Sequence, residues 1–282
     1  MKADFHCHTN ASDGSLSPEA LIDRAKQYEI TDLAITDHDT TKGYESVLSY
    51  AEQQGIHLIS GTEVSCQWQG KTIHIVGLNF DVHNSVLQGG LLWNRILRWQ
   101  RAFQMISKLQ KKNIQQVFED LMPMVQTSMV GRGHFAQLLL QRGIVSSQQQ
   151  AFDRYLTKGR PAYAAVDWPE LSEVVGWITQ AGGVAVIAHP HIYKMTSKKL
   201  NQMIVEFKAA GGQAIEVVNQ PRVCAEQTGM ADRAVRYELY ASLGSDFHRP
   251  EQNWRGLGWL APMPAKCKPV WSLWQPTEHL QC

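Results

Sequence analysis

The 282-residue chain has few cysteines and no sign of cysteine chemistry. Its five cysteines are scattered and odd in number, and no Cys-x-x-Cys pair occurs. This pattern argues against a disulfide framework and against a zinc finger, and it favours a reducing compartment. A chain of this length can bury a sizeable core without staples, so any metal would serve chemistry rather than folding.

Segments that would take the chain to a membrane are also lacking. No apolar run approaches the roughly 20 residues of a membrane-spanning helix, and the chain does not begin with a basic and then apolar segment. We therefore expect a cytoplasmic protein without a membrane partner. Neither Gly-x-Ser-x-Gly nor Gly-x-x-x-x-Gly-Lys occurs, so neither a serine nucleophile nor a P-loop is indicated.

The formal net charge of +1 hides two regions of opposite sign. Residues 84–165 hold eleven Lys or Arg and three acidic residues, a net of +8, whereas the remainder holds 16 basic and 23 acidic residues, a net of −7. No clear strand pattern appears in the basic stretch, but residues 91–112, 134–143 and 147–156 have helical patterns. We predict a basic helical insert over an acidic body.

Outside the insert, short apolar runs alternate with helical patterns. Seven runs are predicted to be strands, because they are mostly apolar without strict alternation, as in a buried parallel sheet. Ser17 is predicted to cap the first helix, with Pro18 at its first position. The alternation predicts a wound α/β barrel. The predicted strands cover residues 1–5, 32–36, 57–61, 72–78, 183–188, 214–218 and 239–244, and the helices begin near residues 18, 41, 171, 197 and 226.

Histidines and carboxylates gather at these predicted strands. In a parallel α/β barrel the carboxyl ends of all strands lie on one face, where active sites are found. Six of the seven strands bring such a group, and only the strand that ends at Asn219 supplies no obvious one. A single histidine is usually structural, but nine such groups are hard to explain by packing. The candidate ligands are His6, His8, Asp13, His38, Glu63, His74, His189, Asp246 and His248.

This donor set predicts a cluster of metal ions. Nine ligands are too many for one ion, because a catalytic zinc uses about three protein ligands. They suit two or three divalent ions, with Glu63 as a bridging carboxylate. Nitrogen and oxygen donors without thiolate favour manganese, iron or zinc over calcium. We expect Mn²⁺, with Fe or Zn as alternatives.

The motifs, in this order, resemble those of the PHP (polymerase and histidinol phosphatase) superfamily of metal-dependent phosphoesterases. The chain length and the helical insert resemble its TrpH/YciV-like subgroup. The resemblance implies a distorted (β/α)7 barrel, residues 1–83 and 166–282, with a helical insert, residues 84–165, that caps the carboxyl face. The motifs are His6-x-His8, Asp13-Gly14, Thr36-Asp37-His38, Gly61-x-Glu63, His74, Ala188-His189-Pro190 and Ser245-Asp246-x-His248.

The same resemblance implies three metal positions and a nucleophile. A hydroxide that bridges two ions near Glu63 would attack phosphorus, because cations lower the pKa of bound water. Asp37, Asp39 and His191 flank ligands and would orient them through hydrogen bonds. By match to the family motifs, one ion is held by His6, His8, Glu63 and Asp246, a second by Glu63, His74 and His189, and a third by Asp13, His38 and His248.

The insert is predicted to supply substrate contacts. Arg132, His134 and Arg160 are the candidates, because glycines beside an arginine let the backbone approach a phosphate that the guanidinium can grip. Three further arginines of the insert, at a spacing of three residues, fit a solvated helix face instead. They are Arg95, Arg98 and Arg101.

The subgroup resemblance implies two related activities. One is removal of the 3′-phosphate from nucleoside 3′,5′-bisphosphates, and the other is 5′→3′ exonuclease action on short RNA or DNA with a 5′-phosphate. Both hydrolyse the phosphoester on the 3′ oxygen of a nucleotide whose 5′-phosphate is anchored, here by the basic insert. A histidinol-phosphate or other small-molecule phosphatase is the alternative within the superfamily. From the residues alone an amidohydrolase and a non-catalytic nucleic-acid-binding module stay open, and a monomer is expected.

Overall fold

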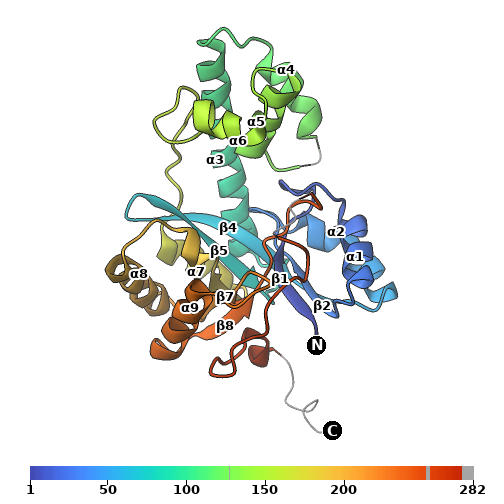
Figure 1. Ribbon diagram of the computed structural model, residues 1–282, viewed down its shortest axis with the longest axis vertical. Coiled ribbons are helices and arrows are strands. Elements are labelled where there is room, and N and C mark those ends of the chain that lie inside the picture. The colour runs from blue at the N-terminus through green and yellow to red at the C-terminus, as the bar shows by residue number, and fades with distance from the viewer. Residues whose placement is uncertain (127, 252–254, 275–282) are drawn as a thin grey trace.

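The computed structural model describes residues 1–126, 128–251 and 255–274, so His279 and Cys282 lie outside the described residues. Figure 1 shows a body of strands and helices, above which a group of shorter helices stands on one long helix. The described cysteines are free: Cys7, Cys66, Cys224 and Cys267.

The described part of the body contains eight strands. They are β1 (Ala3–Cys7), β2 (Asp32–Ile35), β3 (His57–Ile59), β4 (Gly61–Trp68), β5 (Lys71–Leu78), β6 (Val184–Ile187), β7 (Ala214–Val218) and β8 (Tyr240–Leu243). One sheet has the order β1-β2-β3 and the other β4-β5-β6-β7-β8. Single backbone bridges, Cys7 with Phe247 and His38 with Glu63, connect the two sheets.

The hairpin of β4 and β5 corrects the expectation of seven parallel strands. Residues 61–68 form a strand that the apolar runs do not reveal, and β5 is antiparallel to both β4 and β6. Gln69 and Gly70, both with positive φ, make the tight turn between them, as twisted hairpins require. The α/β class is confirmed, whereas closure into a (β/α)7 barrel stays a prediction.

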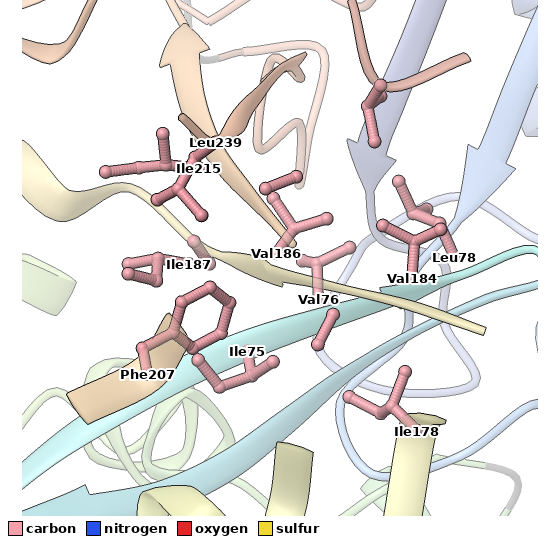
Figure 2. Packing of buried hydrophobic residues seen from close by; sticks show 14 of the residues in the cluster. Ile75, Val76, Leu78, Ile178, Val184, Val186, Ile187, Phe207, Ile215 and Leu239 are labelled. Atoms are coloured by element: carbon pink, nitrogen blue, oxygen red, sulfur yellow. The ribbon is translucent and has the colours of Figure 1, made fainter. Parts of the chain in front are cut away.

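Helices cover both sheets of the body. α1 (Pro18–Gln27) and α2 (Lys42–Gln53) pack on the first sheet, and Ser17 caps α1 as predicted, because its side chain accepts a hydrogen bond from Ala20 N. α7 (Leu171–Gln180), α8 (Ser197–Ala209) and α9 (Ala225–Arg236) pack on the second. Figure 2 shows Ile75, Ile187 and Phe207 meeting in this core. Two 3-10 turns complete the body, Pro190–Ile192 and Val270–Leu273.

The basic stretch is helical and has a hydrophobic core of its own, formed by buried residues between Ala102 and Ala164. Its helices are α3 (Ser85–Gln110), α4 (Val117–Met124), α5 (Arg132–Gln141) and α6 (Gln148–Ala151), with a π-helical turn at Phe152–Leu156. The first half of α3 instead packs on the body through Leu87 and Leu91. The division at residues 84 and 165 therefore stays a prediction. No helix of the described residues is long and apolar enough to cross a membrane.

A buried ion pair ties the insert to the body. The Asp39 carboxylate accepts hydrogen bonds from Arg98 Nε at 2.6 Å, Asn94 Nδ2 at 2.7 Å and Ser65 N at 2.9 Å. Burial would raise the pKa of Asp39, but the Arg98 guanidinium and these hydrogen bonds lower it. The solvated-face interpretation is wrong for Arg98 and Arg101, which are 6% and 9% exposed, because this face of α3 lies over the body.

Two adjacent glycines of α3 give a matched test of how this helix packs. A Cβ at Gly90 would lie 2.3 Å from the Trp177 ring, whereas one at Gly89 would meet nothing within 4 Å. We expect Gly90→Ala to lower the free energy of unfolding by about 1–3 kcal/mol through overpacking. Gly89→Ala should raise it by about 0.5–1 kcal/mol, because alanine favours a helix. Urea unfolding measures both, and equal effects would contradict the packing described.

Candidate metal centre

The structure brings all nine sequence-predicted ligands together. Their donor atoms fall into four overlapping groups, and within each group the atoms lie within 4.8 Å of one another. The groups are His8, Asp13, His38 and His248; His6, Glu63 and His189; His6, His8 and Asp246; and His38, Glu63 and His74. That these residues bind metal stays a prediction.

Strand geometry explains why distant segments converge here. Side chains alternate along β4, so Val64, Cys66 and Trp68 enter the core of the body while Glu63 points to the opposite face. The bridge between His38 and Glu63 brings the end of β2 to the same place. Asp246 N donates to His6 O at 2.8 Å, which sets the residues after β8 beside β1.

The Glu63 carboxylate lies at the centre of the group and is 1% exposed. Its Oε1 lies 2.8 Å from His189 Nε2 and 2.9 Å from His74 Nδ1. Its Oε2 lies 3.0 Å from His38 Nδ1, 3.3 Å from His8 Nε2 and 3.4 Å from His6 Nε2. One carboxylate thus stands among five imidazoles, which is the placement expected of a bridging ligand.

The imidazoles keep the carboxylates of the site charged. Burial alone would raise the pKa of Glu63, yet the neighbouring imidazoles, His74 first among them, bring it well below its usual value. The pKa values of Asp13 and Asp246 are lowered in the same way, with His248 as the strongest opposing charge. Two buried carboxylates, Glu63 and Asp246, and the partly exposed Asp13 make this a place that favours cations.

Unpaired polar atoms test whether this donor set fits metal. Five buried atoms of the candidate ligands have no hydrogen-bond partner, whereas nearly all buried polar atoms in proteins have one. The distances of 3.3–3.6 Å from His6 and His8 Nε2 to Glu63 and Asp246 are long for hydrogen bonds. Two donors each about 2.1 Å from a shared cation would stand roughly 3–3.5 Å apart, so the donor set fits. The unpaired atoms are His6 Nε2, His8 Nε2, Asp13 Oδ1, His38 Nδ1 and His189 Nδ1.

The grouping differs in part from the expected division among three ions. His8 belongs both to the group of His6 and Asp246 and to the group of Asp13. His8 Nδ1 lies 3.9 Å from Asp13 Oδ1, so the motifs His6-x-His8 and Asp13-Gly14 are neighbours in this site. Glu63 is likewise shared between two groups.

Sequence reasoning missed Glu216, the buried glutamate of β7. Its Oε1 accepts a hydrogen bond from His6 Nδ1 at 2.5 Å, and its Oε2 accepts one from the His189 backbone N–H at 2.5 Å. β7, the strand that was expected to bring no obvious ligand, therefore orients the His6 ring so that its Nε2 faces Glu63. A glutamate within the apolar run AIEVV was the available signal, because buried glutamate is almost always paired.

The residues expected to support the ligands behave differently from one another. Asp37 accepts hydrogen bonds from Thr9 Oγ1 and Ser12 Oγ, both at 2.6 Å, so it holds the loop that leads to Asp13 rather than an imidazole. His191 contacts the Asn219 amide at 2.6 Å, and no hydrogen bond joins it to a candidate ligand in the described residues. The unexpected neighbour of a candidate ligand is Arg255, which contacts the Asp246 carboxylate.

Three residues at this site have backbone angles in the left-handed region. The φ angles of Asp39, His189 and Asp246 are 53°, 31° and 53°. Side chains other than glycine occupy this region at an energetic cost. At these points the chain leaves a strand and turns its side chain toward the site or the insert.

A cavity of about 440 Å³ separates the candidate ligands from the insert. Asp13, His38 and His74 line it together with four arginines, which we call the arginine wall. Arg101 is buried 5.6 Å over the Trp168 ring, and burial with two neighbouring guanidiniums lowers its pKa to about 9. The four arginines are Arg98, Arg101, Arg132 and Arg249.

Of the three residues predicted to contact phosphate, one lines this cavity. Arg132 is exposed at the start of α5 and lines the cavity. His134 does not line it, because its Nδ1 accepts from Gly131 N at 3.0 Å and its Nε2 lies 3.3 Å from Ser128 Oγ. Arg160 is exposed and lies outside the residues that line the cavity. Arg101 and Arg249 were missed, because a helical pattern does not tell which arginines face a cavity.

A family model described as the PHP domain matches residues 4–167. The chain belongs to the PHP family. It is 40% identical to the 3′,5′-nucleoside bisphosphate phosphatase of Chromobacterium violaceum, over 95% of this chain and 94% of that one. It is 37% identical to the 5′-3′ exoribonuclease Rnm of Escherichia coli, over 98% and 94%.

A solved structure agrees with this membership. An amidohydrolase, so described, from Chromobacterium violaceum with bound sulfate and no metal has a TM-score of 0.90 and 39% identity, over 97% of this chain and 95% of that chain. The predicted superfamily and the predicted class, a hydrolase of phosphoesters, are therefore confirmed. The nine candidate ligands of this PHP chain still rest on geometry and donor chemistry.

Glu216 gives a test of the metal centre that does not alter a candidate ligand. Glu216→Ala should weaken the retention of divalent metal by about 10- to 100-fold, because His6 loses the partner that orients its ring. Metal content after dialysis against graded chelator measures this, and circular dichroism checks folding. Glu226→Ala, at an exposed glutamate of α9, is the control. Unchanged metal retention in Glu216→Ala would show that the sheet alone orients His6.

Proposed function

We propose that this PHP chain hydrolyses the phosphoester on the 3′ oxygen of a nucleotide whose 5′-phosphate is anchored by the insert. Its substrates would be nucleoside 3′,5′-bisphosphates and 5′-phosphorylated RNA or short DNA, which it would shorten from the 5′ end. The observation that carries the proposal is a single cavity whose lining includes the candidate ligands Asp13, His38 and His74 together with four arginines. Two relatives carry names with these two activities.

The candidate ligands and the arginines of the cavity would have different roles. The nine candidate ligands would hold two or three divalent cations, with Mn²⁺ favoured and Fe or Zn as alternatives. Such ions supply an activated water and neutralise charge on the phosphoryl oxygens. Arg101 and Arg132 would grip the 5′-phosphate through charge-assisted hydrogen bonds. A volume of about 440 Å³ lies in the range typical of small-ligand sites.

The arginine wall also weighs against the alternatives. A histidinol-phosphate phosphatase would need the metal site, but its substrate would not call for four arginines in the same cavity. An amide substrate would not need them either. A non-catalytic binding module would not need nine ligands that converge within a few ångströms.

A substrate panel tests the reaction itself. With Mn²⁺ present, we expect turnover of a 3′,5′-bisphosphate nucleotide and of 5′-phosphorylated RNA, much slower turnover of 5′-hydroxyl RNA, and little of histidinol phosphate. Chelation should abolish all of it, and Mn²⁺ should restore it. Equal rates on 5′-phosphoryl and 5′-hydroxyl RNA would contradict an anchored 5′-phosphate.

Arg132 tests the anchor. Arg132→Ala should lower kcat/KM for 5′-phosphorylated RNA by about 10- to 100-fold, the usual worth of a hydrogen bond to a charged group. The rate on 5′-hydroxyl RNA should change little, since that substrate has no phosphate to anchor. Arg160→Ala, outside the cavity, is the matched control. A loss for Arg160→Ala without one for Arg132→Ala would reverse this assignment.

A further inference from the structure

A second cavity, of about 720 Å³, lies along a different face of α3 from the one that lines the catalytic cavity. Leu92, Ile96, Trp99 and Phe103 of α3 line it, together with Met122 of α4 and Lys42 of α2. Leu92 and Phe103 are 51% and 54% exposed. We call this feature the α3 groove. Large exposed apolar surfaces on proteins usually mark binding sites, and the proposed reaction does not use this one.

The aromatic rings of Trp99 and Phe103 line the α3 groove, and the Phe118 ring of α4 lies beside them. The ring centroids of Trp99 and Phe103 lie 5.8 Å apart, and those of Phe103 and Phe118 lie 6.2 Å apart in a stacked arrangement. Arg95 and Phe103, eight residues apart on the helix, are separated by about 12 Å along its axis. Such a row of rings is the kind of platform on which unpaired bases stack, whatever their sequence.

The charge along the α3 groove has a single sign. The charged side chains that line it in the described residues are Lys42 and Arg95, and the insert as a whole has a net charge of +8 between residues 84 and 165. Asp120, on the adjacent α4, is paired with Arg142 at 2.5 Å. Basic side chains beside aromatic ones match a phosphate backbone with exposed bases, whereas a second copy of the chain would place like charges face to face.

The α3 groove also begins beside the catalytic site. Arg95 Nη1 donates to Asp39 O at 3.2 Å, and Asp39 follows the candidate ligand His38. Met129, which lines the α3 groove, donates through its backbone N–H to Ala11 O at 2.9 Å, in the loop that carries Asp13. A nucleic-acid chain that leaves the catalytic cavity past this loop therefore meets the α3 groove.

We infer that the α3 groove binds the single-stranded RNA that continues in the 3′ direction from the scissile phosphate, with its bases stacked on Trp99 and Phe103. This inference rests on the proposed function. In that reaction one water adds across the bond between the 3′ oxygen and phosphorus, which releases a nucleoside 5′-monophosphate and leaves the phosphate on the remaining RNA. RNA held in the α3 groove keeps this new 5′-phosphate near the arginine wall, so successive cleavages follow without full release.

Phe103→Ala tests the inference, because Phe103 is exposed and lies outside the catalytic cavity. We expect kcat/KM for a 5′-phosphorylated RNA octamer to fall roughly 5- to 100-fold, the usual effect of losing a stacked base. The number of cleavages per binding event should fall as well. Hydrolysis of a 3′,5′-bisphosphate nucleotide, which is too short to reach the α3 groove, should stay unchanged. Phe103→Trp should retain activity on the octamer.

Trp93→Ala is the matched control, because Trp93 is 50% exposed on the same helix but does not line the α3 groove. An equal loss in both variants, or equal losses on octamer and bisphosphate, would overturn the inference. So would a dimer, measured by light scattering, that Phe103→Ala dissociates while octamer cleavage persists. If the parent protein cleaves neither substrate, the proposed function fails instead, so the two failures are distinguishable.

Discussion

The structure depends on a buried carboxylate, Glu63, which is surrounded by five imidazoles. An ionised carboxylate without partners would be very costly to bury, so β4 holds Glu63 here only because other segments bring partners to it. These partners come from residues 6 to 189 of the chain. The hairpin, the turns after β1 and β2 and the turn after β6 all serve this convergence. Five donor atoms of the candidate ligands are still without a hydrogen-bond partner, which fits the predicted binding of cations.

The insert and the body share one helix, α3. α3 packs on the body through its first half and joins the hydrophobic core of the insert through its second half. The ion pair of Asp39 and Arg98 fixes the helix directly beside the candidate ligand His38. Since breaking a buried ion pair leaves an uncompensated charge, movement of the insert away from the body is costly. The arginines of the insert that line the cavity are therefore held at a fixed distance from the candidate ligands.

Local patterns were enough to find the candidate ligands but not their surroundings. His6, His8 and Asp246 follow from one rule, that the ends of parallel strands converge. The β4 strand was missed because only mostly apolar runs were predicted to be strands. Residues from Glu63 to Trp68 instead alternate between polar and apolar. Glu216 was missed because it is a single polar residue within an apolar run, and the run was interpreted only as a buried strand.

The contacts that the side chains of the insert make could not be predicted from the sequence. A helical period shows that Arg98 and Arg101 lie near one face of α3, but it does not show what covers that face. Only tertiary packing decides that Arg98 pairs with Asp39 and that Arg101 borders the cavity. In the same way, His134 reads as a phosphate contact beside glycines until its ring is seen to hold the start of α5.

The left-handed backbone at Asp39, His189 and Asp246 has a consequence for protein engineering. Glycine or asparagine relieves this conformation, whose cost is on the order of 1 kcal/mol or more per residue. A sequence optimised for thermal stability alone would be steered toward those residues at all three positions. It would relieve the backbone strain, but it would lose one buried ion pair and two candidate metal ligands. Stabilising designs for this chain must therefore leave the three positions unchanged and seek their gains elsewhere.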